Sequence, residues 1–187
     1  MASGSGSNAE KIIQYFKNHK AINIACVITN NEKAGAIERA EKARVPSTYF
    51  SKEDFEQPNR IMSYLESKQV DYIVLAGFLL KIAPEIIAQY PDKIINIHPA
   101  LLPKYGGKGM YGMNVHRAVK NNGDIQSGMT IHQVNEKYDD GDILFQAVVA
   151  LDKSDTPESI AKKVLTLEHK HYPLIIEEYI KKQHISL

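Results

Sequence analysis

The chain has 187 residues, which fits one domain, and 43% of its residues are hydrophobic while 24% are charged. Its 23 Lys and Arg residues nearly balance its 22 Asp and Glu residues, so neither a nucleic-acid-binding surface nor a polybasic membrane anchor is expected. The single cysteine, Cys26, excludes an intramolecular disulfide framework and favours a reducing compartment. No apolar run reaches the ~18 residues of a membrane helix, and no signal-peptide pattern opens the chain. These features predict a compact cytoplasmic domain.

The first half of the chain alternates helix and strand signals. Ile12, Ile13 and Phe16 form an apolar stripe that indicates a helix, with Asn8 as its candidate cap. The elements expected after it are a strand over 22–28, a helix over 34–43, a strand over 45–50, a helix over 60–67, a strand over 72–76, a short helix over 84–88 and a strand over 93–97. This alternation predicts an α/β fold, with an open, mostly parallel twisted sheet and helices on both faces.

The second half has a different pattern. A loop-like stretch over 101–113 holds Pro103 and four glycines, and a helix is expected over 114–120. Two strands, over 128–134 and 143–150, flank a polar turn and are expected to form an antiparallel pair. The chain then predicts a long C-terminal helix over 156–182, interrupted at Pro173. No repeat or linker divides the sequence, so a single domain over 1–187 is expected.

The opening run Ser3-Gly4-Ser5-Gly6-Ser7-Asn8 leads directly into the first expected helix. Glycines let the backbone approach a ligand closely, and the first amides of a helix point toward an anion. The run is therefore a candidate phosphate site. A flexible linker or a tag remnant would give the same pattern and stays open as the alternative.

Asn96 and His98 follow a buried strand and lie two residues apart, so both can point into the crevice at the carboxyl end of the sheet. An asparagine amide can donate to a developing oxyanion, and a histidine can move a proton near neutral pH. The structural alternative is a histidine bonded to backbone beside an Asx turn.

Three carboxylates lie in the turn between the last two strands, at Asp139, Asp140 and Asp142. A carboxylate close to His98 would raise the pKa of the imidazole and fix its orientation. A solvated turn or a weak calcium site would give the same sequence.

The histidines do not form a metal-binding pattern. His98, His116 and His132 have no ligand spacing with Cys26, and two further histidines, His169 and His171, diverge on a helix. No metal is therefore expected.

The motif Asn96-Ile97-His98-Pro99-Ala100-Leu101-Leu102-Pro103-Lys104-Tyr105, followed later by Asp139-Asp140-Gly141-Asp142, resembles the folate-dependent formyltransferase family. Leu75-Ala76-Gly77-Phe78 and the opening Gly-Ser run are further features of that family, and the likeness covers essentially the whole chain. It implies a Rossmann-like formyltransferase fold. It also implies transfer of a formyl group from 10-formyltetrahydrofolate to the amine of glycinamide ribonucleotide, in purine biosynthesis.

The resemblance also implies a role for individual residues. Asn96 is expected to stabilise the oxyanion, His98 to act as general acid, and Asp139 to raise the pKa of that histidine. The residues expected to bind substrate are Gly6, Ser7 and Asn8 for the phosphate, Glu168 for the glycinamide part, and Leu79, Leu80, Lys81 and Ile82, with Asn96, for the folate.

Two features depart from the family pattern. The family begins with a buried strand before the Gly-Ser loop, whereas only Met1-Ala2-Ser3 precedes the loop here, so that strand is expected to be missing and an interior edge unpaired. The stretch 106–114 is also longer and richer in glycine than the family pattern.

Three alternative functions stay open on the sequence. Two are enzymes of the same fold, a formyltetrahydrofolate hydrolase and a tRNA formyltransferase-like enzyme. The third is a non-catalytic folate- or nucleotide-binding module. The expected partners are small-molecule substrates, and a monomer or a homodimer fits the sequence equally well.

Overall fold

The computed structural model describes residues 1–185, which form two compact units. The first unit runs from Met1 to Ile95 and the second begins at Asn96, so the division falls inside strand β4 (Ile94–His98). None of the described helices is both long enough and apolar enough to cross a membrane. The single domain over 1–187 stays a prediction.

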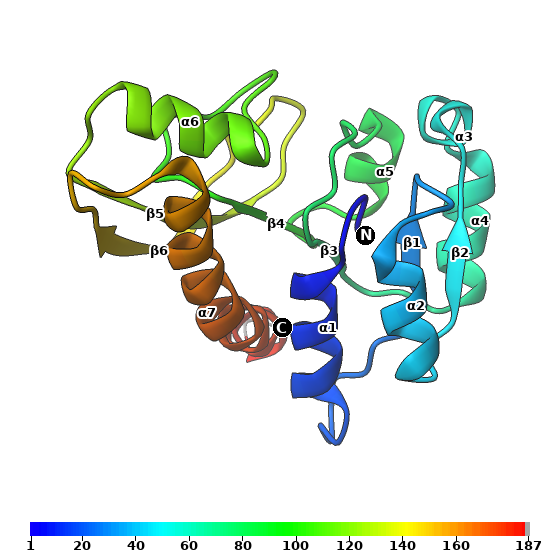
Figure 1. Ribbon diagram of the computed structural model, residues 1–187. Coiled ribbons are helices and arrows are strands. Elements are labelled where there is room, and N and C mark those ends of the chain that lie inside the picture. Colours follow the sequence, from blue (N-terminus) through cyan, green and yellow to red (C-terminus); the bar gives the residue numbers. More distant parts are fainter. Residues whose placement is uncertain (186–187) are drawn as a thin grey trace. The chain divides into compact units, whose positions relative to one another are not determined.

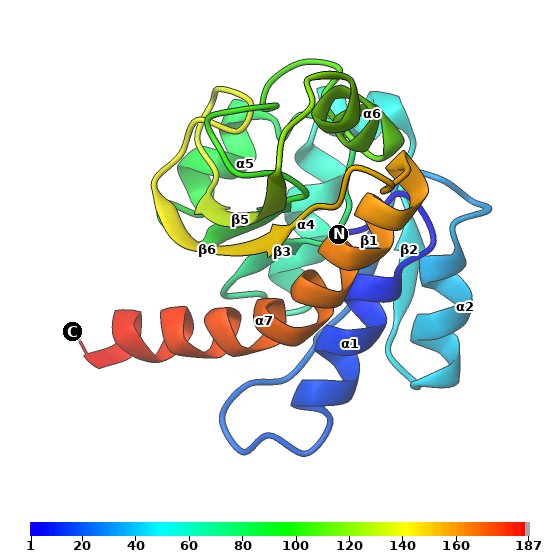
Figure 2. The same ribbon diagram turned by 60° about the vertical axis from the view of Figure 1, so that its left-hand side comes forward.

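The first unit alternates helices and strands, as the sequence predicts. Its elements are α1 (Ser7–Phe16), β1 (Val27–Thr29), α2 (Gly35–Lys42), β2 (Ser47–Tyr49), α3 (Lys52–Glu56), α4 (Asn59–Ser67), β3 (Ile73–Leu75) and α5 (Pro84–Gln89). Strands β1 and β2 pair in parallel, with Val27 opposite Ser47. Helices α2 and α4 lie on opposite sides of this pair in both views (Figure 1, Figure 2). The predicted α/β class is confirmed.

The second unit contains the predicted antiparallel pair and the long C-terminal helix. Its elements after β4 are α6 (Met113–Asn121), β5 (Gln126–Gln133), β6 (Ile143–Ala150) and α7 (Pro157–Ile185). Strands β5 and β6 are antiparallel, with an irregularity between Ile131 and His132. The strand order of the larger sheet is β3-β4-β5-β6.

Helix α7 continues through Pro173, so the predicted interruption there is wrong. A proline inside a helix removes one backbone hydrogen bond and bends the axis, and Figure 2 shows α7 changing direction along its length. Tyr172 is fully buried and Ile176 is 2% exposed, one on each side of the proline. Burial of these side chains stabilises the helix on both sides of the bend.

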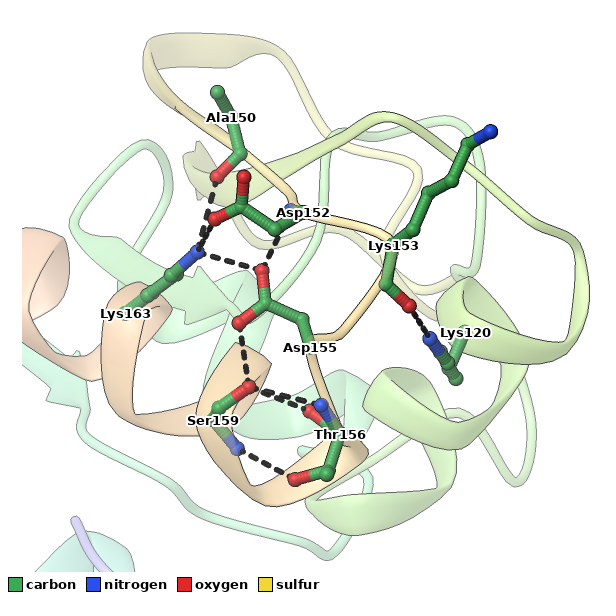
Figure 3. A network of polar contacts seen from close by, with 8 residues as sticks. All are labelled: Lys120, Ala150, Asp152, Lys153, Asp155, Thr156, Ser159 and Lys163. Atoms are coloured by element: carbon green, nitrogen blue, oxygen red, sulfur yellow. Dashed lines mark hydrogen bonds and ion pairs between the residues drawn. The ribbon is translucent and has the colours of Figure 1, made fainter.

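A network of polar side chains holds the first turn of α7 (Figure 3). Asp155 accepts hydrogen bonds from the Asp152 N–H at 2.7 Å, from Ser159 Oγ at 2.6 Å and from Lys163 Nζ at 2.6 Å. The pKa of Asp155 lies well below its usual range, and the hydrogen bond from Lys163 is the largest cause. Thr156 Oγ1 accepts from the Ser159 N–H at 3.3 Å and caps the helix.

The residues before the Gly-Ser loop lie between strands β1 and β3 and hydrogen-bond to both. On the β3 side, the Met1 amino group donates to the Val74 carbonyl at 2.6 Å, and the Ala76 N–H donates to the Met1 carbonyl at 2.8 Å. On the β1 side, the Ala2 N–H donates to the Ile28 carbonyl at 3.0 Å. The interior edge that the sequence leaves unpaired is therefore occupied by this short segment.

Ser3 ties the Gly-Ser loop to two neighbouring segments of the first unit. Its Oγ accepts a hydrogen bond from the Leu79 N–H at 2.9 Å and donates to Asn30 Oδ1 at 2.5 Å. Its own N–H donates to the Gly77 carbonyl at 3.0 Å, and the residue is only 6% exposed. The start of the chain is thus held by specific hydrogen bonds, which a flexible linker does not make.

Replacing Ser3 with Ala removes the acceptor of the Leu79 N–H. We expect the free energy of unfolding to fall by about 1 kcal/mol or more, because a partly buried donor loses its partner. Urea unfolding followed by circular dichroism measures the change. Ser67→Ala is the matched control, since its hydroxyl donates to the Tyr64 carbonyl but the residue is exposed. Equal losses in the two variants would contradict the role given to Ser3.

Candidate active site

Strand β4 positions the two central polar side chains of the candidate site. Its β-branched Ile95 and Ile97 are 0% and 6% exposed and favour an extended backbone. Asn96 and His98 alternate with these isoleucines and therefore share the other face of the strand. Asn96 is half-buried and His98 is 4% exposed.

His98 contacts an acceptor at each ring nitrogen. Nε2 lies 2.7 Å from the backbone carbonyl of Tyr105, and Nδ1 lies 3.5 Å from Asp139 Oδ2. A carbonyl oxygen only accepts, so Nε2 carries a hydrogen. The imidazole can therefore hold its second proton at Nδ1, toward the carboxylate.

Opposing effects act on the pKa of His98. Burial is the largest and lowers the pKa below its usual range, whereas Asp139 and the hydrogen bond to Tyr105 raise it. The positive charge that His132 can carry lowers it slightly further. The upward effect that the sequence predicts for Asp139 is present, but burial outweighs it.

Asp139 accepts a hydrogen bond from backbone and lies near a second histidine. Its Oδ2 accepts the Gly107 N–H at 2.9 Å, and its Oδ1 lies 3.7 Å from His132 Nε2. Burial raises the pKa of the Asp139 carboxyl, but His132, His98 and the Gly107 N–H lower it by more. The pKa therefore lies below its usual range, and the group is ionised at neutral pH.

His132 belongs to the same cluster of side chains as Asn96, His98 and Asp139. Its spacing in the sequence excludes it as a metal ligand and indicates no other role. Its Nδ1 lies 2.6 Å from the Gln133 carbonyl and is the donor, so the neutral ring presents Nε2 as an acceptor to Asn96 Nδ2 at 3.1 Å. The second N–H of the Asn96 amide can donate to a developing oxyanion. A signal was available in the sequence, since the polar Thr130 and His132 alternate with the apolar Met129 and Ile131.

The candidate phosphate residues lie at the start of α1, in the first unit. Gly6, not Asn8, is the N-cap, so the predicted cap is wrong; Asn8 lies in the first turn and is 8% exposed. The φ of Gly6 is 75°, and a Cβ there would lie 2.5 Å from the Cα of Ala36. Only glycine fits this close approach of the loop to α2.

The candidate folate segment also lies in the first unit. Leu79 is 49% exposed and Lys81 is exposed, whereas Leu80 is half-buried and Ile82 belongs to the core at 3% exposure. The bond from the Leu79 N–H to Ser3 ties this segment to the Gly-Ser loop.

The predicted site residues thus fall into two groups, one in each unit. The structure brings together Asn96, His98 and Asp139 in the second unit, and Glu168 lies on α7 of the same unit at 7% exposure. Among residues 1–185, no three His, Cys, Asp or Glu side chains are placed to hold a metal ion.

Replacing Asp139 with Asn removes the charge that favours the protonated form of His98. We expect the pKa of His98 to fall further, so that its NMR titration midpoint moves to lower pH. Asp140→Asn is the matched control, because its carboxylate is the next residue in the turn but 54% exposed. Identical His98 titrations in the Asp139 variant and the unchanged protein would contradict the assignment.

The chain matches the family model described as Formyl transferase over residues 1–176. It is 37% identical to the phosphoribosylglycinamide formyltransferase of Haemophilus influenzae, a match that covers 95% of this chain and 84% of that protein. It is 41% identical to the chloroplastic phosphoribosylglycinamide formyltransferase of Arabidopsis thaliana over 96% of this chain. This chain spans 65% of that plant protein, and 58% of its counterpart in Vigna unguiculata.

Two solved structures to which the chain is similar carry the same name. The crystal structure of the phosphoribosylglycinamide formyltransferase from Bacillus halodurans superposes with a TM-score of 0.86 at 33% identity, covering 97% of this chain and 94% of that one. The corresponding protein of Brucella melitensis gives a TM-score of 0.85 at 33% identity, over 95% and 92% of the two chains.

Proposed function

The chain belongs to the formyl transferase family, and from this premise we propose that it transfers the formyl group of 10-formyltetrahydrofolate to the amine of glycinamide ribonucleotide. One observation carries the proposal. Asn96 and His98 lie on one face at the end of β4, and the Asp139 carboxylate lies 3.5 Å from the imidazole. This arrangement offers an oxyanion donor beside a proton donor, which acyl transfer to an amine requires.

In the proposed reaction, the neutral amine attacks the formyl carbon, a new C–N bond forms, and the formyl oxygen becomes an oxyanion. The Asn96 amide donates a hydrogen bond to that oxygen, and its bond to His132 fixes the amide orientation. Collapse of the tetrahedral intermediate breaks the bond to the folate nitrogen. That nitrogen gains a proton and the attacking amine loses one, so protons balance over the transfer.

His98 supplies the proton for the departing nitrogen in this scheme. Asp139, ionised at neutral pH, stabilises the imidazolium and counteracts the burial that lowers the pKa of His98. The carboxylate can then accept the proton that the amine releases, directly or through water, and return the pair to its starting state.

The binding roles extend the proposal to the other predicted residues. Gly6, Ser7 and Asn8 would hold the substrate phosphate at the start of α1, where helix amides favour an anion. Glu168 would contact the glycinamide part. The segment from Leu79 to Ile82, with Asn96, would line the folate site, with its backbone anchored at Ser3.

The cellular setting stays a prediction. The single Cys26 and the balanced charge favour the cytoplasm and small-molecule substrates rather than nucleic acid or a membrane. A monomer and a homodimer are both compatible with the proposal.

A spectrophotometric assay with a 10-formyl folate donor, run with and without glycinamide ribonucleotide, tests the function. We expect donor consumption only when the ribonucleotide is present. Consumption without it would identify a hydrolase instead. Binding of the folate without consumption under either condition would identify a non-catalytic module.

Asn96→Ala and His98→Ala should abolish most of the turnover without loss of fold. Removing an oxyanion donor costs about 10²–10³ in kcat, and removing a general acid about 10²–10⁴. Asn135→Ala and His184→Ala are matched controls, because both side chains are exposed and lie outside the cluster. Near-normal turnover in His98→Ala would refute the mechanism.

A further inference from the structure

A single tight turn binds both members of the His98–Asp139 pair. The carbonyl of Tyr105 accepts from His98 Nε2, and the N–H of Gly107, two residues later, donates to Asp139 Oδ2. Between them, a Cβ on Gly106 would lie 3.3 Å from the Cβ of Asp139, so the turn packs against the Asp139 side chain. The position of this turn therefore sets the relation between the imidazole and its carboxylate.

The backbone at Tyr105 is not in a relaxed conformation. Its φ is 57°, in the left-handed region that costs an ordinary residue of order 1 kcal/mol or more. Such a conformation persists only where surrounding contacts hold it. Here the contact comes from the side chain, because the Tyr105 hydroxyl donates to Asp124 Oδ2 at 2.8 Å.

Asp124 is itself fixed by three groups. Besides the Tyr105 hydroxyl, its Oδ1 accepts from Asn122 Nδ2 at 2.8 Å and lies 3.6 Å from Lys104 Nζ. The bond from Tyr105 is the largest cause that lowers the pKa of the Asp124 carboxyl, which keeps the acceptor charged. The carboxylate side chain is 17% exposed, so its hydrogen bonds are partly protected from water.

We propose that Asp124 is a positioning residue for the His98–Asp139 pair, and that it acts through the Tyr105 hydroxyl by holding the turn whose carbonyl and amide bind the two side chains. The proposal rests on the function proposed above. One charge-assisted hydrogen bond, from Tyr105 to Asp124, would hold the strained turn in the position where it binds His98 and Asp139. Neither Asp124 nor the Tyr105 hydroxyl touches His98 itself.

Several groups face His98, and the test must separate them. Asp139 raises the pKa of His98, and the possible positive charges of His132 and His116 oppose its protonation. The Tyr105 carbonyl raises it through its hydrogen bond. Displacing the turn removes that bond and weakens the contact to Asp139, so both losses lower the pKa of His98.

The experiment compares Tyr105→Phe, Asp124→Ala and the double variant. Each should lower kcat by roughly tenfold to a hundredfold, the loss that a displacement of about 1 Å produces, with KM for both substrates unchanged. The alkaline limb of the pH–rate profile and the NMR titration midpoint of His98 should both move to lower pH. The double variant should lose no more of kcat than the Asp124→Ala variant, because both substitutions break the same hydrogen bond. Asp124→Asn keeps an oxygen acceptor and should retain most of kcat.

Tyr64→Phe is the matched control, since it removes a tyrosine hydroxyl that accepts from Thr48 Oγ1 at 2.8 Å in the first unit. It should leave the His98 titration unchanged. Loss of stability in the Tyr105 and Asp124 variants without any change in kcat or in the His98 midpoint would overturn the proposal. So would an effect of Asp124→Ala that Tyr105→Phe does not reproduce.

The NMR arm separates this proposal from the function on which it rests. A His98 midpoint that moves in the variants of a protein with no formyl transfer would support the positioning and refute only the proposed function. An active protein whose His98 midpoint and kcat ignore both variants would support the function and refute the positioning.

Discussion

Burying the imidazole of His98 at 4% exposure removes it from water, and desolvation alone disfavours its protonated form. The Tyr105 carbonyl on one ring nitrogen and the Asp139 carboxylate on the other oppose that effect. The protonated imidazole therefore requires these two neighbours, and the rest of the site follows from that requirement. The carboxylate needs its own donors, which Gly107 supplies, and the carbonyl needs a turn held in a left-handed conformation.

The glycine-rich stretch after Tyr105 is consistent with the same requirement. A Cβ on Gly106 would lie 2.7 Å from Leu102 Cδ2 and 3.3 Å from Asp139 Cβ, so a side chain there would displace one or both, and Gly107 has a φ of 93°. An ordinary residue at either position would push the turn away from the pair or strain its backbone. The glycines that depart from the family pattern therefore include two that bring backbone against the candidate catalytic carboxylate.

Period-two alternation and the location of ligands at strand ends predicted that Asn96 and His98 share one face at a strand end, and the motif likeness singled out Asp139 among the three carboxylates of the turn. The structure brings the three side chains together, and their roles stay predictions. Most elements of the fold were also predicted, although one strand is shorter than expected and one helix was missed. The strand expected over 22–28 shortens to β1, because only Val27 to Thr29 lie opposite β2. Helix α3 was missed because its five residues carry no periodicity, although Ser51 and Asp54 form a capping box.

What the sequence could not reveal are contacts that exist only in the folded chain. The continuity of α7 through Pro173 depends on the burial of its neighbours, which outweighs local proline chemistry. Alternation along β5 marks the face on which His132 lies, but its contact with Asn96 exists only once β5 lies beside β4. The bond between Tyr105 and Asp124 spans 19 residues, and nothing in the local sequence of either residue predicts it. Spacing rules work within one element, whereas these contacts join different elements.

The most direct test of this account is to determine, by ¹⁵N NMR of labelled histidines, which ring nitrogen of His98 keeps its hydrogen when the imidazole is neutral. The contacts of His98 predict the Nε2–H form, because the Tyr105 carbonyl at 2.7 Å can only accept. The second proton is then added at Nδ1, toward Asp139, as the pH falls. A neutral ring with its hydrogen on Nδ1 would contradict this prediction, since Nε2 would then have no hydrogen to donate to Tyr105.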